Sequence, residues 1–375
     1  MKKNLIVFGT RPEAIKMAPL VKAFEDHQDA FETKVCITAQ HREMLDQVLD
    51  FFEITPDYDL DLMKPNQNLY SLTAGIIENM KPVLESFQPD YVYVHGDTST
   101  TMAAALAAFY SGAEVCHVEA GLRTFNKRAP FPEEINRSIA GRLADYHFSP
   151  TDRSRENLLN EAILEENIKV TGNTVIDALL FSVDKLQQQN YSDTEIESVQ
   201  KEVDISKKII LVTGHRRENH GEGFINICKA LKEIAEKNPD CQLVYPVHLN
   251  PNVQKPVYDL LSKVENIKLI APLNYPAFVW LMEKSYLIIT DSGGVQEEAP
   301  SLGKPVLVMR EITERPEAVK AGTVILVGTN TEKIITETQK LVDDKSYYQS
   351  LSRLHNPYGD GKASERIISF MKAKA

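Results

Sequence analysis

The sequence lacks several features that would place a protein in a class directly. Its cysteines are Cys36, Cys116, Cys228 and Cys241. They stand singly, without CxxC spacing, in apolar or amphipathic segments, so we interpret them as reduced core residues of a cytoplasmic protein. No apolar run approaches the roughly 18 residues that a membrane span needs. The short apolar run near the start ends at Gly9, which indicates a first strand and not a signal peptide.

The chain has fewer basic residues than acidic ones. The chain carries 42 lysines and arginines against 53 aspartates and glutamates, a net charge of −11. A strongly acidic surface argues against nucleic acid as a partner. It does not exclude a small anionic ligand, because a few local arginines set the field inside a cleft.

Several signatures of cofactor chemistry are also missing. No GxGxxG follows a strand, which argues against a bound nicotinamide cofactor, and neither a GxxxxGK[ST] loop nor a GxSxG turn occurs. No HExxH or close His/Cys cluster indicates zinc. We therefore expect no cofactor and no metal. Carboxylates and histidines remain for acid/base work, with arginines for phosphate.

Short apolar runs alternate with amphipathic helical segments along all 375 residues, a length that suits two α/β domains. This rhythm predicts parallel sheets with helices on both faces, which is a doubly wound, Rossmann-like architecture. The expected strands of the first half are 4–8, 33–38, 91–95, 114–118, 146–148 and 168–171. Those of the second half are 209–213, 242–247, 267–271, 287–290, 306–309 and 324–327.

The two halves meet at a helix expected over 173–187 and a polar segment that continues to residue 208. We expect the N-terminal domain to span residues 1–172 and the C-terminal domain to span residues 173–358. The turn-rich stretch 357–361 lets the last helix, within 359–375, pack back on the first domain. Two doubly wound halves that face each other place the carboxyl ends of their strands at a shared cleft, where ligands bind.

Polar motifs collect at these strand ends. The strand 287–290 runs into Asp291-Ser292-Gly293-Gly294, and a helix opens directly afterwards. Unpaired N–H groups at a helix N-terminus hold anions, and glycine lets the backbone approach a phosphate. Glu297 and Glu298 are placed to accept hydrogen bonds from sugar hydroxyls. This stretch predicts a diphosphate-sugar site, with an ordinary glycine-rich corner as the alternative.

Carboxylates follow strands in the first half. Asp97 and Glu119 each sit beside a glycine at a strand end, and a carboxylate whose pKa is raised by burial transfers protons near neutral pH. The alternative for Asp97 is a cap of the helix that follows. Glu133 and Arg137 share a helix face at i,i+4 spacing, which equally suits a surface ion pair.

Basic residues complete the candidate set. Arg11, Lys16 and Arg315 can clamp phosphates, arginine in bidentate fashion. For Lys16 the alternative is a solvated helix face. His215, in a Gly-His-Arg-Arg turn, can donate to a phosphate or transfer a proton, or it can be structural.

Six ordered motifs carry a resemblance that spans nearly the whole chain. They are Gly9-Thr10-Arg11-Pro12-Glu13, His95-Gly96-Asp97-Thr98, Val118-Glu119-Ala120-Gly121-Leu122-Arg123-Thr124, Pro132-Glu133-Glu134-x-Asn136-Arg137, Gly214-His215-Arg216-Arg217-Glu218-Asn219 and Asp291-Ser292-Gly293-Gly294-Val295-Gln296-Glu297-Glu298. The chain resembles the non-hydrolysing UDP-N-acetylglucosamine 2-epimerases of bacteria. The resemblance implies a glycosyltransferase-B-like fold, a homodimer, and interconversion of UDP-N-acetylglucosamine and UDP-N-acetylmannosamine without metal or nicotinamide.

The resemblance also implies roles. In this family a proton leaves C2 and UDP leaves C1, giving a bound 2-acetamidoglucal, and UDP returns as C2 is protonated on its other face. The acid/base candidates are Asp97, Glu119 and Glu133, supported by Arg137 and His215. The implied UDP ligands are Arg11, Lys16, His215, Ser292, Gly293, Gly294, Glu298 and Arg315, with Phe278 against the uracil.

Two positions qualify the resemblance. Leu273 stands where relatives often carry a glutamine that meets the nucleotide, which puts that side-chain contact in doubt. Gln40 and His41 resemble the stretch where some relatives bind a second substrate molecule as an activator, with a polar helix start as the alternative.

Three other functions fit parts of the pattern. A UDP-sugar glycosyltransferase of the same architecture needs the Ser-Gly-Gly helix but not three acids in the first domain. A hydrolysing epimerase, which releases N-acetylmannosamine and UDP, uses the same motifs. A nucleotide-sugar sensor predicts binding without exchange at C2.

Overall fold

The computed structural model describes residues 1–38, 42–62 and 67–374. The chain forms two compact units, Met1–Ala178 with Tyr358–Ala375, and Leu179–Pro357. No helix in the described ranges combines the length and apolar character that crossing a membrane requires.

The first unit is built on a parallel sheet in the strand order β3-β2-β1-β4-β5-β6-β7, as far as the chain is described. The strands are β1 (Lys2–Phe8), β2 (Phe31–Ile37), β3 (Tyr58–Asp59), β4 (Tyr91–His95), β5 (Glu114–Val118), β6 (Tyr146–Ser149) and β7 (Ile168–Val170). The central strand β4 is buried along its whole length, because helices cover both faces of a parallel sheet.

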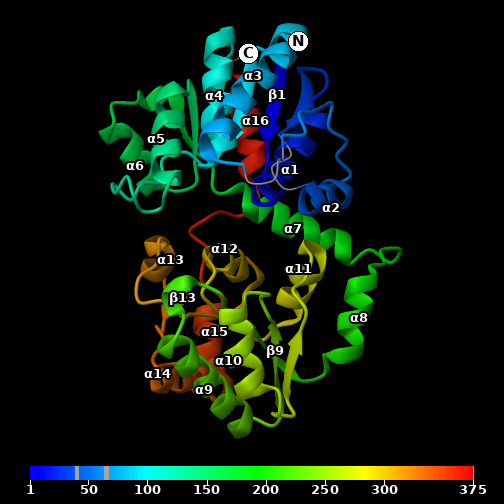
Figure 1. The fold of residues 1–375 in the computed structure, drawn as a ribbon, viewed down its shortest axis with the longest axis vertical. Helices are drawn as coiled ribbons and strands as arrows, with labels where there is room; N and C mark the ends of the chain where they lie inside the picture. The colour runs from blue at the N-terminus through cyan, green and yellow to red at the C-terminus, as the bar shows by residue number, and fades with distance from the viewer. Residues whose placement is uncertain (39–41, 63–66, 375) are drawn as a thin grey trace. The chain divides into compact units, whose positions relative to one another are not determined.

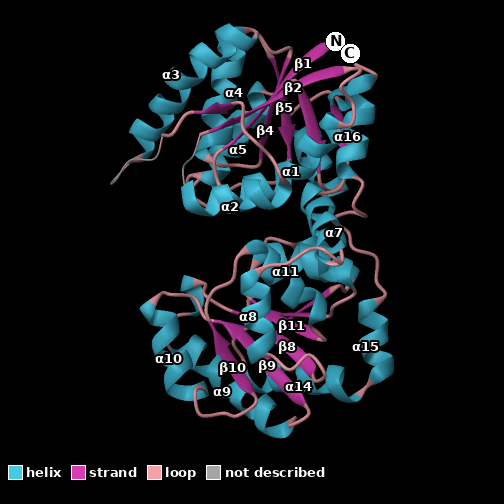
Figure 2. Ribbon diagram, turned by 90° about the vertical axis from the view of Figure 1, so that its right-hand side faces the viewer, coloured by secondary structure: helices cyan, strands magenta, loops and turns pink. Residues whose placement is uncertain are grey.

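Helices cover the two faces of this sheet (Figure 2). They are α1 (Arg11–Glu25), α2 (Arg42–Phe52), α3 (Leu69–Phe87), α4 (Ser99–Ser111), α5 (Glu133–Leu143), α6 (Asp152–Asn160), α7 (Thr174–Leu186) and α16 (Ala363–Lys372). α4 packs between α3 and α5, whereas α16 lies against α1 (Figure 1). The Asp177 carboxylate of α7 accepts the N–H groups of Ala363 and Ser364, which fixes the start of α16.

The second unit is a parallel sheet in the order β10-β9-β8-β11-β12-β13, again within the described residues. Its strands are β8 (Lys208–Thr213), β9 (Cys241–Pro246), β10 (Ile267–Ile270), β11 (Leu287–Thr290), β12 (Val306–Val308) and β13 (Val324–Leu326). Its helices are α8 (Thr194–Glu202), α9 (Glu222–Lys237), α10 (Pro251–Leu261), α11 (Tyr275–Lys284), α12 (Gly293–Glu298), α13 (Pro316–Ala321), α14 (Thr331–Asp343) and α15 (Lys345–Ser352).

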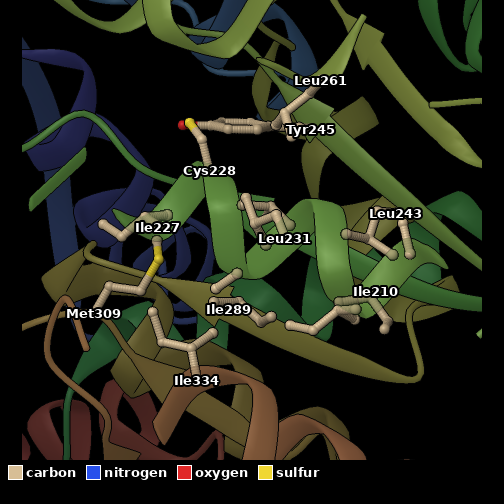
Figure 3. Close-up of a cluster of buried hydrophobic side chains, with 14 of the residues drawn as sticks. Ile210, Ile227, Cys228, Leu231, Leu243, Tyr245, Leu261, Ile289, Met309 and Ile334 are labelled. Carbon is tan, nitrogen blue, oxygen red and sulfur yellow. The ribbon is translucent and has the colours of Figure 1, made fainter. Parts of the chain in front are cut away.

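The core of the second unit forms where α9 and α14 pack on the sheet. Figure 3 shows Ile289 of β11 between Leu231 of α9 and Ile334 of α14, whereas the sulfur of Cys228 lies beside Tyr245. These side chains are almost completely buried. The four cysteines of the chain are free and buried, as expected for reduced core residues.

The predicted doubly wound α/β class is confirmed in each unit, but several elements were not expected, among them α14 and α15 after the last strand. β3 is a two-residue edge strand, and α8 lies in the polar segment that we expected to separate the domains. The predicted domain limits followed residues 172 and 358. By contacts, 173–178 and Tyr358 group with the first unit; the Asn173 N–H donates to the Tyr358 carbonyl oxygen at 2.7 Å, and the Asn173 side chain donates to Glu119.

Gly121, in the loop after β5, has no room for a side chain. Its φ is +90°, and an added Cβ would lie 2.2 Å from the Ser154 carbonyl oxygen. Gly112 has a similar φ of +83°, but no described atom lies within 4 Å of its Cβ position. Because only Gly121 adds a clash to the unfavourable φ, we expect G121A to lower the free energy of unfolding by about 1–3 kcal/mol more than G112A. Urea denaturation of both variants measures the difference, and equal losses would contradict it.

Candidate functional site

The polar groups of the first unit gather where β4 and β5 end. His95 and Val118 are the last residues of these paired parallel strands. Gly96 and Glu119 follow them, with φ values of +66° and +61°. Positive φ is uncommon for a residue other than glycine and often accompanies function. Glu119 is therefore held in a strained backbone conformation at the carboxyl edge of the sheet.

Donors from two other elements hold the Glu119 carboxylate. Lys16 of α1 donates to its Oε2, and Asn173, just before α7, donates to the same oxygen at 2.7 Å. A cation and an amide donor stabilise the negative charge of the carboxylate. The solvated helix face that we considered for Lys16 is wrong, because its side chain is largely buried in this ion pair.

Two buried histidines lie beside Glu119. His95 Nε2 is 3.7 Å from Glu119 Oε2. Nε2 of His117, on β5, donates to the Gly96 carbonyl oxygen at 2.7 Å. Burial lowers the pKa of each imidazole to about 4, because a low-dielectric site disfavours the cation. Both rings are therefore neutral near pH 7.

Asp97 is held from α5. Arg137 donates to its Oδ2, and Asn136 Nδ2 donates to its backbone carbonyl oxygen at 3.0 Å. Burial raises the pKa of Asp97, and the guanidinium of Arg137 opposes that rise. The cap that we considered for Asp97 is wrong, because Thr98 is the N-cap of α4 and accepts from the Thr101 N–H.

The surface ion pair considered for Glu133 and Arg137 is not what the structure shows. Arg137 instead contacts Asp97 and, at 3.3 Å, the Oε2 of Glu134. Glu134 is buried, and its carboxylate also accepts the N–H of Phe125 at 2.8 Å. Glu133 is half-buried in the first turn of α5. Arg137 therefore links Asp97 to the loop that precedes α5.

Glu13 organises the turn that carries Arg11. Its Oε2 accepts the N–H groups of Gly9 and Thr10, and its Oε1 accepts the Thr98 hydroxyl at 2.6 Å. Burial raises the pKa of Glu13, opposed by these hydrogen bonds. Glu13 thus ties the turn after β1 to the turn after β4. Arg11 is the first residue of α1 and is half-buried.

In the second unit, two arginines lie against the glycine turn. β11 ends at Thr290, Ser292 is the N-cap residue of α12, and α12 begins at Gly293. A Cβ built on Gly293 would lie 3.8 Å from the guanidinium of Arg315 and 3.9 Å from that of Arg216. Because Gly293 has no side chain, backbone N–H groups and two guanidinium groups converge on one small space, an arrangement that suits phosphate.

The two glutamates of α12 have different surroundings. Glu297 is buried and accepts a hydrogen bond from Arg315, which fixes that side chain. Glu298 turns back toward the start of the helix, since its Oε2 lies 3.7 Å from the Cβ position of Gly294. Glu298 is thus the carboxylate beside the glycines, where a sugar hydroxyl would be met.

Asp291 positions the loop after β8. Its fully buried Oδ2 accepts the N–H groups of His215 and Arg216 at 2.9 and 2.8 Å. Its Oδ1 is 3.7 Å from His215 Nδ1. Burial lowers the pKa of His215, and the Asp291 charge opposes this. His215 also stacks on His248, with ring centroids 5.2 Å apart.

For Phe278 and Leu273, which were also singled out in the sequence, the structure gives burial and a position in the fold. Phe278 is a half-buried residue of α11, and Leu273 is half-buried just before that helix. Gln40 and His41 lie outside the described residues. Among the residues that the structure does describe, no group of three or more His, Cys, Asp or Glu side chains is arranged to hold a metal ion.

Sequence reasoning missed two polar contacts. Arg216 was within a quoted motif but was not separated from Arg217, which is exposed. Asn173 was treated only as a helix start, although it holds Glu119. Two consecutive arginines directly after a strand were a sequence signal for Arg216. Neighbouring side chains at a strand end point in different directions, so one of the two faces the protein interior. No local sequence pattern indicated that Asn173 contacts Glu119, because the two residues are 54 positions apart in the sequence.

Comparisons with known proteins identify the family of this chain. The family model described as UDP-N-acetylglucosamine 2-epimerase matches residues 22–372. Proteins of that name from Salmonella typhimurium and Campylobacter jejuni are 58% and 59% identical, and each alignment covers 99% of this chain and 98% and 97% of theirs.

The structure of UDP-GlcNAc 2-epimerase from Neisseria meningitidis, bound to UDP-GlcNAc, is 54% identical with a TM-score of 0.89. The match covers 99% of this chain and 100% of that one. It confirms the expected glycosyltransferase-B-like fold of two doubly wound domains. The chain belongs to the UDP-N-acetylglucosamine 2-epimerase family.

Proposed function

We propose that this protein interconverts UDP-N-acetylglucosamine and UDP-N-acetylmannosamine without net hydrolysis. The observation that carries the proposal is the paired set of carboxylates at the ends of β4 and β5, where Asp97 is held by Arg137 and Glu119 by Lys16 and Asn173. Epimerisation at C2 needs one group to remove a proton and another to return one on the opposite face. Two separately held carboxylates supply both.

In the proposed mechanism, a carboxylate takes the C2 proton as the bond between C1 and the UDP oxygen breaks. The C–H electron pair forms the C1=C2 double bond of a 2-acetamidoglucal, and UDP departs with the electrons of the C1–O bond. UDP then adds back to C1 while an acid delivers a proton to the other face of C2. Atoms and charge balance without any redox partner.

The proposed residues fall into two groups by role. Asp97, Glu119 and Glu133 of the first unit act at C2, with Arg137 in support. The residues proposed to bind UDP are Arg11, Lys16, His215, Phe278, Ser292, Gly293, Gly294, Glu298 and Arg315. We add Arg216 to this set, because its guanidinium lies beside Gly293 together with that of Arg315. Firm anchoring keeps the departed UDP in place for its return to C1.

Proton NMR of UDP-N-acetylglucosamine with the purified protein in deuterated water tests the proposal. We expect UDP-N-acetylmannosamine carrying deuterium at C2, with no cofactor or acceptor added. Free N-acetylmannosamine and UDP would instead identify a hydrolysing enzyme. Binding with an unchanged spectrum would contradict epimerisation and favour a transferase or a sensor, and an acceptor-dependent product would single out the transferase.

We also propose that the protein works as a homodimer in the cytoplasm. α4 and α5 carry exposed apolar side chains, among them Phe109, Tyr110, Ile135 and Ile139. Exposed apolar patches are typical of contact surfaces. The four free, buried cysteines suit a reducing compartment. Light scattering is expected to give twice the mass of one chain.

A further inference from the structure

His95 presents an imidazole nitrogen that has no hydrogen-bond partner among the described residues. Its Nε2 is fully enclosed, and His95 is only 3% exposed. In the tautomer that carries its proton on Nδ1, a neutral imidazole has a lone pair on Nε2, and this is the tautomer used in the proposal below. A buried acceptor without a donor is costly and calls for an explanation.

Glu119 Oε2 lies 3.7 Å from this nitrogen. That distance is too long for a hydrogen bond. While Glu119 is ionised and held by Lys16 and Asn173, both its Oε2 and His95 Nε2 are hydrogen-bond acceptors, so a shorter distance between them would not form a hydrogen bond. The relation changes when Glu119 binds a proton, because its new O–H group then needs an acceptor in a buried site.

We propose that His95 is a positioning residue that accepts a hydrogen bond from Glu119 whenever Glu119 carries the substrate's proton. The role rests on the proposed epimerisation, in which Glu119 alternates between ionised and protonated forms. Lys16 and Asn173 stabilise the ionised form, and His95 Nε2 stabilises the protonated form. Glu119 therefore has a partner in both states, and the His95 Nε2 acceptor, which lacks a donor while Glu119 is ionised, gains one when Glu119 is protonated.

The alternative is that His95 only fills space at the end of β4. Leucine and glutamine both fill much of the space of the imidazole, but only glutamine, which is one bond longer, places an acceptor near the position of Nε2. We therefore expect H95L to lower kcat by about 5- to 150-fold, with KM changed by less than about threefold. H95Q is expected to restore most of kcat. H95L at near wild-type kcat, or equal losses in H95L and H95Q, would overturn the proposal.

A measurement without catalysis separates this inference from the proposed function. E119Q carries a permanently neutral side chain with an N–H donor in place of the transient O–H group. We expect ¹⁵N NMR of histidine-labelled protein to show the His95 Nε2 resonance moving toward that of a hydrogen-bonded acceptor in E119Q, with H95Q used for assignment. An unmoved resonance would overturn the pairing. A shifted resonance in E119Q, together with a wild-type protein that does not epimerise its substrate, would instead overturn only the proposed reaction.

Discussion

Replacing Glu119 with glutamine is expected to lower the rate of epimerisation by about 10²–10⁴-fold. Glutamine keeps the size of the side chain but cannot take the C2 proton or return one. The change also removes the charge that Lys16 and Asn173 hold at Oε2. Two measurements check this expectation, the kcat of product formation and the rate of deuterium uptake at C2.

The affinity of the E119Q variant for UDP should change much less than kcat, because most of the proposed UDP contacts, among them Arg216 and Arg315, lie in the second unit, and the first-unit ligand Lys16 keeps its charge although it loses its ion pair with Glu119. Glu78, an exposed residue of α3, provides a matched control. E78Q makes the same chemical change on the surface and should keep wild-type kcat. An E119Q variant with more than about a tenth of wild-type kcat would remove Glu119 from the acid/base set.

The central strands of both sheets were predictable because they are buried on both faces. The expected ranges 91–95, 114–118 and 287–290 coincide with β4, β5 and β11. Each is a short, mainly apolar run that is followed by a polar turn. β3 could not be found this way, since two residues at a sheet edge make no pattern. α8 was missed because only Ile196 and Val199 of its side chains are buried.

The residue types of the candidate site were also predictable, but which side chains contact one another was not. Glu133 and Glu134 are neighbours with the same chemistry, and spacing alone favoured Glu133 as the partner of Arg137. The structure pairs Arg137 with Glu134 because Glu134 turns toward the backbone of Thr124 and Phe125. That choice depends on how the loop before α5 enters the helix, which is a property of tertiary structure.

Arg216 and Arg217 present the same ambiguity, and this pair makes a sharp test of the proposed UDP site. The Arg216 guanidinium lies beside Gly293, and its Nε is enclosed without a hydrogen-bond partner among the atoms that the structure describes. Arg217 is exposed. Both residues carry one positive charge, so their effects on the long-range field are similar. They differ in whether the guanidinium reaches the glycine turn.

We therefore expect R216M to weaken UDP binding by about 10- to 150-fold, which corresponds to the loss of charge-assisted hydrogen bonds of about 1.5–3 kcal/mol. R217M removes the same charge from the next position and should weaken binding less than about threefold. Calorimetric titration with UDP measures both. Equal losses of UDP affinity in R216M and R217M would mean that Arg216 acts only through its long-range electrostatic field and not through direct hydrogen bonds. No loss in R216M would place the diphosphate away from Gly293, leaving Arg315 to its ion pair with Glu297.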